Sequence, residues 1–136
     1  IDRERYLDFV KTFLEMYRIG GKLPQWELWG NYTGVMIGYH THSVILDAYA
    51  KGIKGFDEEV AFEAMKNRVK DIPYYKDFGY IPADKESGSV SKVMEYAYND
   101  WSIAQMAKYL KKKRTISNFK KEHNFIKTAT TLPLAL

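Results

Sequence analysis

The chain has 136 residues, of which 46% are hydrophobic, so its length suits one compact domain with a buried core and excludes wholesale disorder. It contains no cysteine, which excludes a disulfide framework, and no apolar run approaches the roughly 20 residues of a membrane-spanning helix. The net charge of +4 comes from residues 111–136, which hold seven basic side chains against the single acid Glu122. The body, residues 1–110, is slightly acidic and has no basic stripe for nucleic acid.

Residues 2–18 predict an amphipathic helix that ends at Gly20 and Gly21. Its apolar residues recur at spacings of three and four and so share one face: Tyr6, Phe9, Val10, Phe13, Leu14 and Tyr17. The next segment, KLPQWELWGNYTG at 22–34, is a predicted loop because proline and glycine break regular structure.

Two shorter helices are predicted in the middle of the chain. The first covers residues 35–51, with Gly52 in the stop position. The second covers residues 58–69, with Asp57 as its N-cap and acidic side chains in its first turn, where the helix dipole favours them.

A long connection rich in tyrosine, proline and glycine follows at 71–89, and such long loops inside a compact domain are often functional. The last helix is expected over residues 90–112, capped by Ser89 or Ser91. Because no period-two alternation is visible in residues 1–112, the pattern predicts an all-α fold. Pattern alone does not separate a toroid of paired helices from a simple helical bundle.

The predicted second helix carries two histidines and an aspartate. His40 and Asp47 are seven residues apart and share a face, whereas His42 points to another side. Asp47 stands among apolar residues and needs a partner, so the pattern fits either a hydrogen bond that fixes the helix or a polar spot at a substrate pocket. A zinc site is not indicated, since no second histidine stands at i+3 or i+4.

The last helix carries a second polar group of residues. Glu95 and Asn99 stack at i,i+4, whereas Glu95 and Asp100 do not share a face. Beside Tyr96 and Trp101 these carboxylates could hold sugar hydroxyls or be satisfied core groups, and spacing leaves both open. Since no P-loop, nucleophile elbow or zinc spacing is present, residue patterns alone indicate only a helical domain with two polar–aromatic segments.

Two long stretches resemble glycoside hydrolase family 92, a family of calcium-dependent exo-α-mannosidases. Residues 23–53, LPQWELWGNYTGVMIGYHTHSVILDAYAKGI, carry the family's LP-W-x-L, G-N-Y-T, M-I-G-Y-H and V-I-x-D-A-x-x-K-G-I motifs. Residues 79–107, GYIPADKESGSVSKVMEYAYNDWSIAQMA, resemble its G-Y-x-P motif and the later S-V-S-x-T-L-E-Y-A-Y-D-D-W. The two stretches follow the family's order, and the resemblance covers about residues 1–112.

The resemblance implies a fold and an activity. Family members have an N-terminal β-sandwich and then an (α/α)6 barrel, so residues 1–112 are expected to be a fragment of that barrel with no β-sandwich domain. The enzymes are inverting, with a carboxylic acid that protonates the leaving oxygen, a carboxylate that activates water, and calcium that helps to bind mannose. The acid, the base and the calcium ligands are expected beyond this chain, so no catalytic or metal residue is assigned and the isolated chain is expected to be inactive.

The resemblance also implies a partner, a mannose-containing glycan, and a periplasmic or extracellular location. The residues that could line or support the sugar pocket are Trp26, Glu27, Asn31, His40, Asp47, Glu95 and Asp100. The chain departs from the family where Asn99 replaces the usual aspartate and where Val93 and Met94 replace threonine and leucine. A slice of a barrel leaves apolar helix faces uncovered, so self-association is expected.

Residues 113–136 depart from the family pattern and are expected to be a basic tail. Synonymous codons can be chosen for this stretch so that the same nucleotides, read one base earlier, encode R-A-Q, Y-K-N and D-P-x-x-G-F in the family's order. A one-nucleotide frameshift within the codons of Lys111–Lys113 would explain this departure.

Two other functions are weighed against the enzyme. A non-catalytic helical interaction module would have a polar outer surface and one aromatic face for a partner chain, whereas exposed valine, isoleucine and tryptophan faces would favour a piece of an enzyme. Nucleic-acid binding through the lysine-rich tail predicts strongly salt-dependent affinity, and the slightly acidic body disfavours it.

Overall fold

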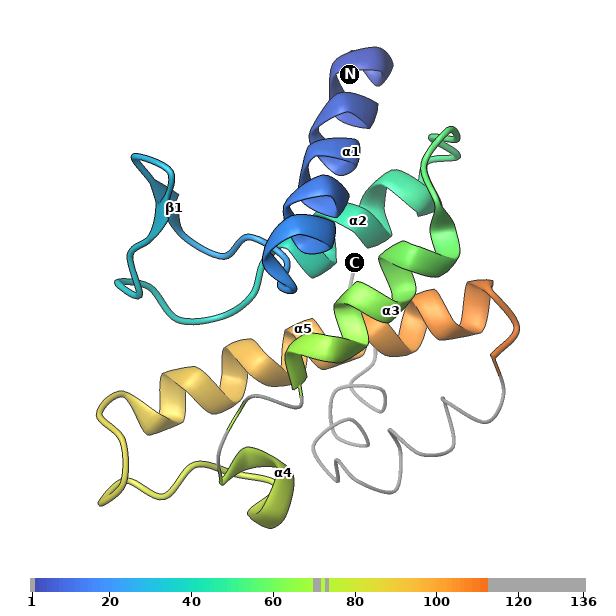
Figure 1. Ribbon diagram of the computed structural model, residues 1–136. Helices are drawn as coiled ribbons and strands as arrows, with labels where there is room; N and C mark the ends of the chain where they lie inside the picture. The colour runs from blue at the N-terminus through green and yellow to red at the C-terminus, as the bar shows by residue number, and fades with distance from the viewer. Residues whose placement is uncertain (1, 70–71, 73, 113–136) are drawn as a thin grey trace.

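The computed structural model describes residues 2–112 except 70, 71 and 73, and this part of the chain is mostly helical (Figure 1). The helices are α1 (Arg3–Gly20), α2 (Thr41–Ala50), α3 (Glu58–Val69), α4 (Tyr75–Phe78) and α5 (Ser89–Tyr109). The prediction of an all-α fold is therefore confirmed. The predicted tail at 113–136 lies outside the described residues. Among the described helices, none combines the length and the apolar character that crossing a membrane requires.

Within the described residues, the only strands form a short antiparallel hairpin in the predicted loop. Strand β1 (Glu27–Leu28) pairs with β2 (Asn31–Tyr32), with Glu27 opposite Tyr32 and Leu28 opposite Asn31. Two residues per strand are too few for the alternation by which a strand is recognised in a sequence.

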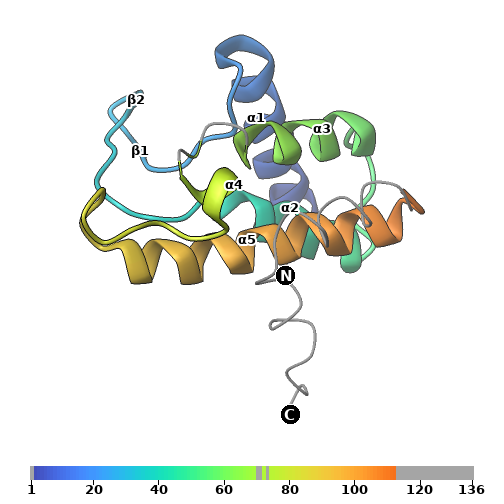
Figure 2. The same ribbon diagram turned by 90° about the horizontal axis from the view of Figure 1, so that it is seen from below.

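Helix α5 runs along one side of the described helices (Figure 2). Helices α2 and α3 both pack on α5, and α1 packs on α2 and α3. The hairpin and α4 lie toward the N-terminal half of α5 in both views.

The buried residues form two clusters, and α5 contributes to both. The larger cluster joins α1, α2 and α3 to Ile103, Met106 and Ala107 in the second half of α5. The smaller cluster lies on the first half of α5, and its members are Tyr39, Ile72, Tyr75, Ile81, Val93 and Tyr96. The second half of the helix is therefore held by packing on three other helices, whereas the first half is held mainly by loop residues.

Local capping explains the helix ends that the sequence predicts correctly. Asp2 caps α1 by accepting a 3.0 Å hydrogen bond from the Arg5 amide. The helix ends at Gly21, whose φ of 75° is left-handed and suits glycine. Asp57 caps α3 in the same way, accepting a 3.0 Å bond from the Val60 amide.

The predicted start of one helix and the predicted cap of another are wrong. Helix α2 begins at Thr41, not at residue 35, because Gly34 and Gly38 have φ values of 65° and 85°, which a right-handed helix does not accommodate. Helix α5 begins at Ser89 after Gly88, which has a φ of 66°, and no serine side chain caps it. Residues 35–40 are therefore a loop that leads into α2.

Candidate functional site

The hairpin presents its side chains to solvent from a tight turn. Trp29 and Gly30 have φ values of 56° and 73°, and two positive values are what a type I′ turn requires. The Trp29 side chain is 90% exposed at the tip. Thr33 closes the hairpin, since its amide and its hydroxyl donate to the Trp26 carbonyl at 3.0 and 2.9 Å. The predicted site residues Trp26, Glu27 and Asn31 lie on this hairpin and its base.

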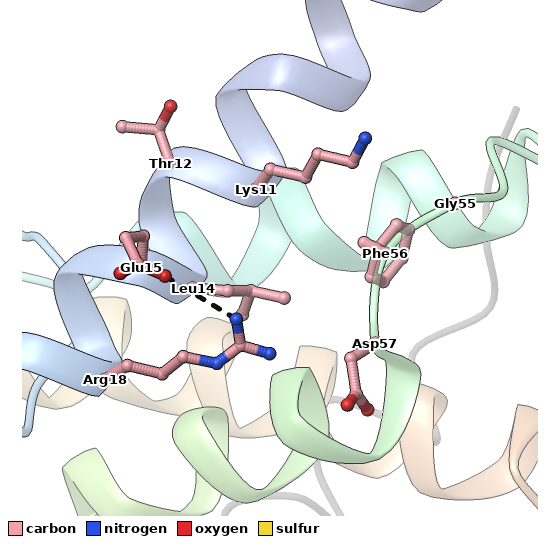
Figure 3. A pocket seen from close by; sticks show the side chains of 8 residues that line it. All are labelled: Lys11, Thr12, Leu14, Glu15, Arg18, Gly55, Phe56 and Asp57. Carbon is pink, nitrogen blue, oxygen red and sulfur yellow. Dashed lines mark ion pairs between the residues drawn. The ribbon is translucent and has the colours of Figure 1, made fainter.

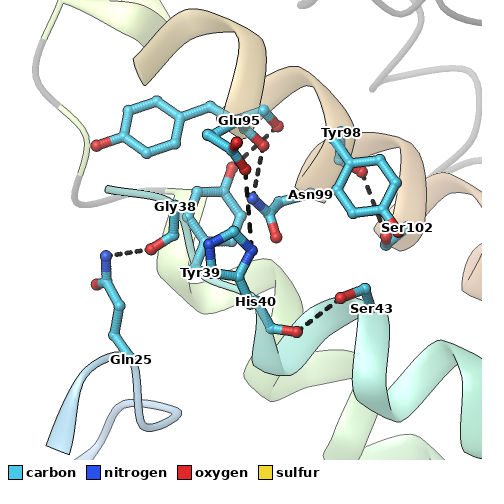
Figure 4. Close-up of polar contacts among 10 residues, drawn as sticks. Gln25, Gly38, Tyr39, His40, Ser43, Glu95, Tyr98, Asn99 and Ser102 are labelled. Atoms are coloured by element: carbon cyan, nitrogen blue, oxygen red, sulfur yellow. Dashed lines mark hydrogen bonds and ion pairs between the residues drawn. The ribbon is translucent and has the colours of Figure 1, made fainter. Parts of the chain in front are cut away.

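His40 and Glu95 form the central polar pair (Figure 4). Nδ1 of His40 lies 3.9 Å from Oε2 of Glu95, and the side chains are 43% and 40% exposed. His40 comes from the loop before α2 and Glu95 from α5, so two segments 55 positions apart in the sequence meet here. The pair therefore presents an imidazole and a carboxylate together to solvent.

Gly38 makes room for this pair. A Cβ atom at position 38 would lie 2.8 Å from the His40 ring and 3.4 Å from Oε2 of Glu95. The Gly38 carbonyl accepts a hydrogen bond from the amide of Gln25, which ties this loop to the segment before the hairpin. A side chain larger than that of glycine at position 38 would therefore collide with the imidazole of His40.

Asp100 lies behind the pair and fixes the backbone that carries His40. Its carboxylate is fully buried and accepts a 2.7 Å hydrogen bond from the hydroxyl of Tyr39, the residue between Gly38 and His40. Burial raises the pKa of Asp100 to about 7, and hydrogen bonds from Tyr39 and Tyr75 oppose this rise. Asp100 thus connects α5 to the loop before α2 and to α4.

His42 is a core residue. Its ring is fully buried, and Nε2 lies 2.9 Å from the carbonyl oxygen of Met65 in α3. Burial lowers the pKa of His42 to about 4, so the imidazole is neutral at pH 7 and Nε2 donates to that carbonyl. The prediction that His40 and His42 point to different sides is confirmed.

Asn99 lies beside Glu95 on α5. The side chain is buried, and its amide donates a 2.5 Å hydrogen bond to the Glu95 carbonyl one turn earlier. Its Oδ1 atom has no hydrogen-bond partner in the part of the chain that the structure describes. A neutral amide at this position therefore avoids an unpaired buried charge.

Asp47 lies apart from the other predicted site residues. Its Oδ2 atom accepts hydrogen bonds from the hydroxyl of Tyr6 at 2.8 Å and from the ammonium of Lys51 at 2.6 Å. The hydrogen bond from Lys51 lowers the pKa of Asp47. The predicted need for a partner is met by α1, and the expected shared face with His40 does not produce a contact, because His40 precedes α2 and faces Glu95.

The structure thus brings His40 and Glu95 together, with Asp100 behind them, and leaves Asp47 elsewhere. Sequence reasoning missed Tyr39, which links Asp100 to the pair, and Gln25, which holds Gly38. The position of Tyr39 next to the candidate residue His40 is the sequence feature that could have identified it.

The described residues do not fit a calcium site. In residues 2–112, apart from 70, 71 and 73, no three histidine, aspartate or glutamate side chains gather closely enough to hold a metal ion. Calcium prefers six to eight oxygen ligands, and the single pair at His40 and Glu95 does not supply them.

Comparisons with known proteins point to one family. Residues 1–128 match the family model of the Glycosyl hydrolase family 92 catalytic domain. A solved family GH92 α-mannosidase from Bacteroides thetaiotaomicron shares 43% identity over 88% of this chain with a TM-score of 0.81, and its complex with mannoimidazole matches equally well. A family GH92 inverting mannosidase from the same species shares 30% identity over 85% of the chain, with a TM-score of 0.79.

A curated fungal protein, described as an uncharacterized secreted glycosidase from Arthroderma benhamiae, is 28% identical over 81% of this chain. The chain spans only 17% of the length of each of these relatives. The similarity is therefore to one segment of much longer proteins.

Proposed function

Because this chain belongs to glycosyl hydrolase family 92, we propose that it is a segment of an inverting, exo-acting α-mannosidase that hydrolyses mannose-containing glycans. The solved relatives support this, since they are described as α-mannosidases, one of them inverting and one in complex with mannoimidazole. In this proposal the helices are part of an (α/α)6 barrel, and the activity belongs to the whole enzyme.

The observation that carries the proposal is the pair of His40 and Glu95. A carboxylate accepts hydrogen bonds from sugar hydroxyls, and an imidazole can donate or accept, so neighbouring groups of this kind suit two adjacent hydroxyls. The buried bond between Tyr39 and Asp100 holds the pair in place from behind. Trp26, Glu27 and Asn31 on the hairpin are proposed to line the same sugar site, and Asp47 to support it from α2.

The catalytic acid, the catalytic base and the calcium ligands are proposed to lie outside this chain. The 136-residue chain is therefore expected to show no hydrolysis of aryl α-mannosides with or without calcium. Hydrolysis by the purified chain would contradict this part of the proposal.

A chimera tests the role of His40 and Glu95. The matching segment of the Bacteroides α-mannosidase that is 43% identical is replaced by residues 1–112, and the chimera is assayed for mannoside hydrolysis. His40→Ala and Glu95→Gln are expected to lower kcat/KM by about tenfold or more each, as for loss of a hydrogen bond to a charged group. Glu63→Gln is the matched control, because Glu63 is an exposed carboxylate on α3 paired only with Lys66 among the described residues.

Exposed apolar side chains favour the enzyme segment over a separate interaction module. They include Ile19 on α1, Val35 after the hairpin, and Val90 and Met94 on α5. Such faces are proposed to contact the rest of a barrel and to cause self-association of the isolated chain. Sedimentation of the purified chain tests this, and a stable monomer at high concentration would favour the interaction module instead.

The boundary at residue 112 and the origin of the tail stay predictions. The family match extends to residue 128, beyond that boundary. Sequencing the genomic locus past the codon of Leu136 tests the proposed frameshift, which requires the other frame to encode the family's next motifs. A periplasmic or extracellular location is proposed from the glycan substrates, and cell fractionation of the source organism checks it.

A further inference from the structure

Arg68 near the end of α3 is a half-buried cation with neutral partners. Its guanidinium donates a 3.2 Å hydrogen bond to Oε1 of Gln25 and lies 5.8 Å from the centre of the Tyr39 ring. No carboxylate in the described part of the chain lies within ion-pair distance of it. Its positive charge lowers the pKa of Tyr39, His42 and Tyr96. For the two tyrosines, burial has a stronger effect in the opposite direction and raises the pKa.

Arg68 lines a cavity of about 490 Å³ between the end of α1 and the hairpin. This volume lies within the range of small-molecule sites. The polar lining comes from Arg68, Gln25, Tyr32, Glu27 and Lys22, and the apolar lining from Met16, Ile19, Leu23 and Pro24. Tyr32 also donates to Oε1 of Gln25 at 3.1 Å, so Arg68 and Tyr32 are held by one amide oxygen.

A second arginine that lines a cavity, Arg18, has an acidic partner. Arg18 lines another cavity, of about 440 Å³, between α1 and the turn before α3 (Figure 3). There its guanidinium lies 3.5 Å from the carboxylate of Glu15. Arg68 has no such partner among the described residues, although it is less exposed to water than a surface side chain.

We propose that the cavity at Arg68 binds the oxyanion of a sugar-sized molecule, such as a phosphorylated or carboxylated hexose. Arginine presents several donors in a planar fork that matches carboxylate and phosphate oxygens, and a partly desolvated cation gains most from an anionic partner. The hydroxyls of such a ligand can bond to Glu27 and Gln25, and its ring can rest on the apolar wall. This site goes beyond the proposed function, because mannose carries no charge.

The test titrates the whole 136-residue chain by NMR with glucose 6-phosphate, glucuronate, inorganic phosphate and glucose. Glucose 6-phosphate and glucuronate are expected to bind and to shift signals of the hairpin and α3, and inorganic phosphate to bind more weakly, whereas glucose is not expected to bind. Arg68→Gln is expected to weaken the binding of glucose 6-phosphate by at least about tenfold, the usual loss for a charged hydrogen bond. Arg18→Gln, the matched control, is expected to leave it unchanged.

Gln25→Glu is a second variant that keeps the guanidinium and gives it an internal carboxylate, and it is expected to abolish binding. Binding that survives in both variants would place the anion on other basic side chains, such as Lys111 and Lys112 after α5, and overturn the proposal. Equal binding of glucose and glucose 6-phosphate would overturn it as well. None of these results bears on the chimera test of His40 and Glu95, so the two proposals fail separately.

Discussion

The hydroxyl of Tyr39 lies 2.7 Å from the buried carboxylate of Asp100, and this bond joins residues 61 positions apart. Tyr39 also packs edge-on against His42, with ring centres 4.6 Å apart. One tyrosine therefore contacts two buried groups whose pKa values are shifted in opposite directions, an aspartate whose pKa is raised to about 7 and a histidine whose pKa is lowered to about 4.

We predict that these two groups give opposite pH dependences of stability. Asp100 has a pKa of about 7 when folded and 3.8 as a free group, so its contribution to the free energy of unfolding falls as pH rises from about 4 to 7. His42 has a pKa of about 4 when folded and 6.5 as a free group, so its contribution falls as pH drops from 6.5 to 4. Each slope is at most about 1.4 kcal/mol per pH unit, and in the native chain they offset one another.

Single substitutions separate the two slopes. In Asp100→Asn the free energy of unfolding is expected to rise between pH 4 and 6.5, and in His42→Gln it is expected to fall between pH 4 and 7. Urea unfolding at a series of pH values measures both. A pH profile that has the same slope in Asp100→Asn as in the native chain would contradict the assignment.

Tyr6→Phe is predicted to loosen α1 from α2. The single proton of the Tyr6 hydroxyl is shared between Asp47 at 2.8 Å and the Val44 carbonyl at 3.0 Å, and loss of this hydrogen bond is expected to cost about 1–2 kcal/mol in urea unfolding. Tyr17→Phe serves as the control, because no described residue makes a hydrogen bond to the Tyr17 hydroxyl, and its cost is expected to be close to zero. Equal costs for both changes would mean that ring packing, not the hydroxyl, holds α1.

Gly38→Ala is predicted to disturb the His40–Glu95 pair. A Cβ atom at 38 adds a 2.8 Å contact with the His40 ring to the backbone strain of a positive φ. At Gly21, where φ is also positive, nothing lies within 4 Å of such a Cβ atom, so Gly21→Ala is expected to cost only the strain, about 1 kcal/mol. The expected difference is a larger loss of stability in Gly38→Ala together with a shifted His40 ring signal in NMR, and unchanged His40 signals would argue against the close packing.

Asn99→Asp, which restores the family's usual residue, is predicted to destabilise this chain. The aspartate would lose the amide that donates to the Glu95 carbonyl and would bury a carboxylate. The expected cost is about 1–3 kcal/mol in thermal or urea unfolding. Its size should grow as pH rises, since the carboxylate is then charged, and a stabilising effect at pH 7 would show that an unseen donor faces this position.

Trp29→Asn is predicted to stabilise the hairpin by roughly 1 kcal/mol, because asparagine tolerates the left-handed conformation better than tryptophan does. Little packing is lost, since Trp29 is almost fully exposed. Leu28→Asn removes a neighbouring exposed apolar side chain without relieving the turn and is not expected to stabilise. A gain in both variants would trace the effect to surface polarity and not to the backbone.

The sequence predicted those elements whose ends carry local signals. Asp57 and the acids that follow it mark the start of α3, and the predicted range of residues 58–69 agrees with the helix that the structure shows. The start of α2 could not be predicted in this way, because the apolar residues at 35–37 continue the helical pattern while the glycines at 34 and 38 turn the chain.

The candidate site was predictable in composition and not in geometry. His40, Glu95 and Asp100 could be selected as polar residues in aromatic surroundings. Their pairing depends on how the loop before α2 packs on α5, and sequence spacing holds no information on it. The partner of Asp47 could not be predicted for the same reason. Tyr6 lies 41 positions away in α1, and the contact depends on how α1 packs against α2.

Helix α5 belongs to two buried clusters, and this has a consequence for how the chain opens. The second half of the helix is surrounded by three other helices, whereas the first half depends on Tyr39, Tyr75 and two isoleucines from connecting segments. Local opening of the first half therefore exposes few apolar contacts and needs little free energy, and amide protons there should exchange with solvent faster than those after Ile103. The two halves of one continuous helix would then behave as separate cooperative units, and the half that carries Glu95 would be the one that opens first.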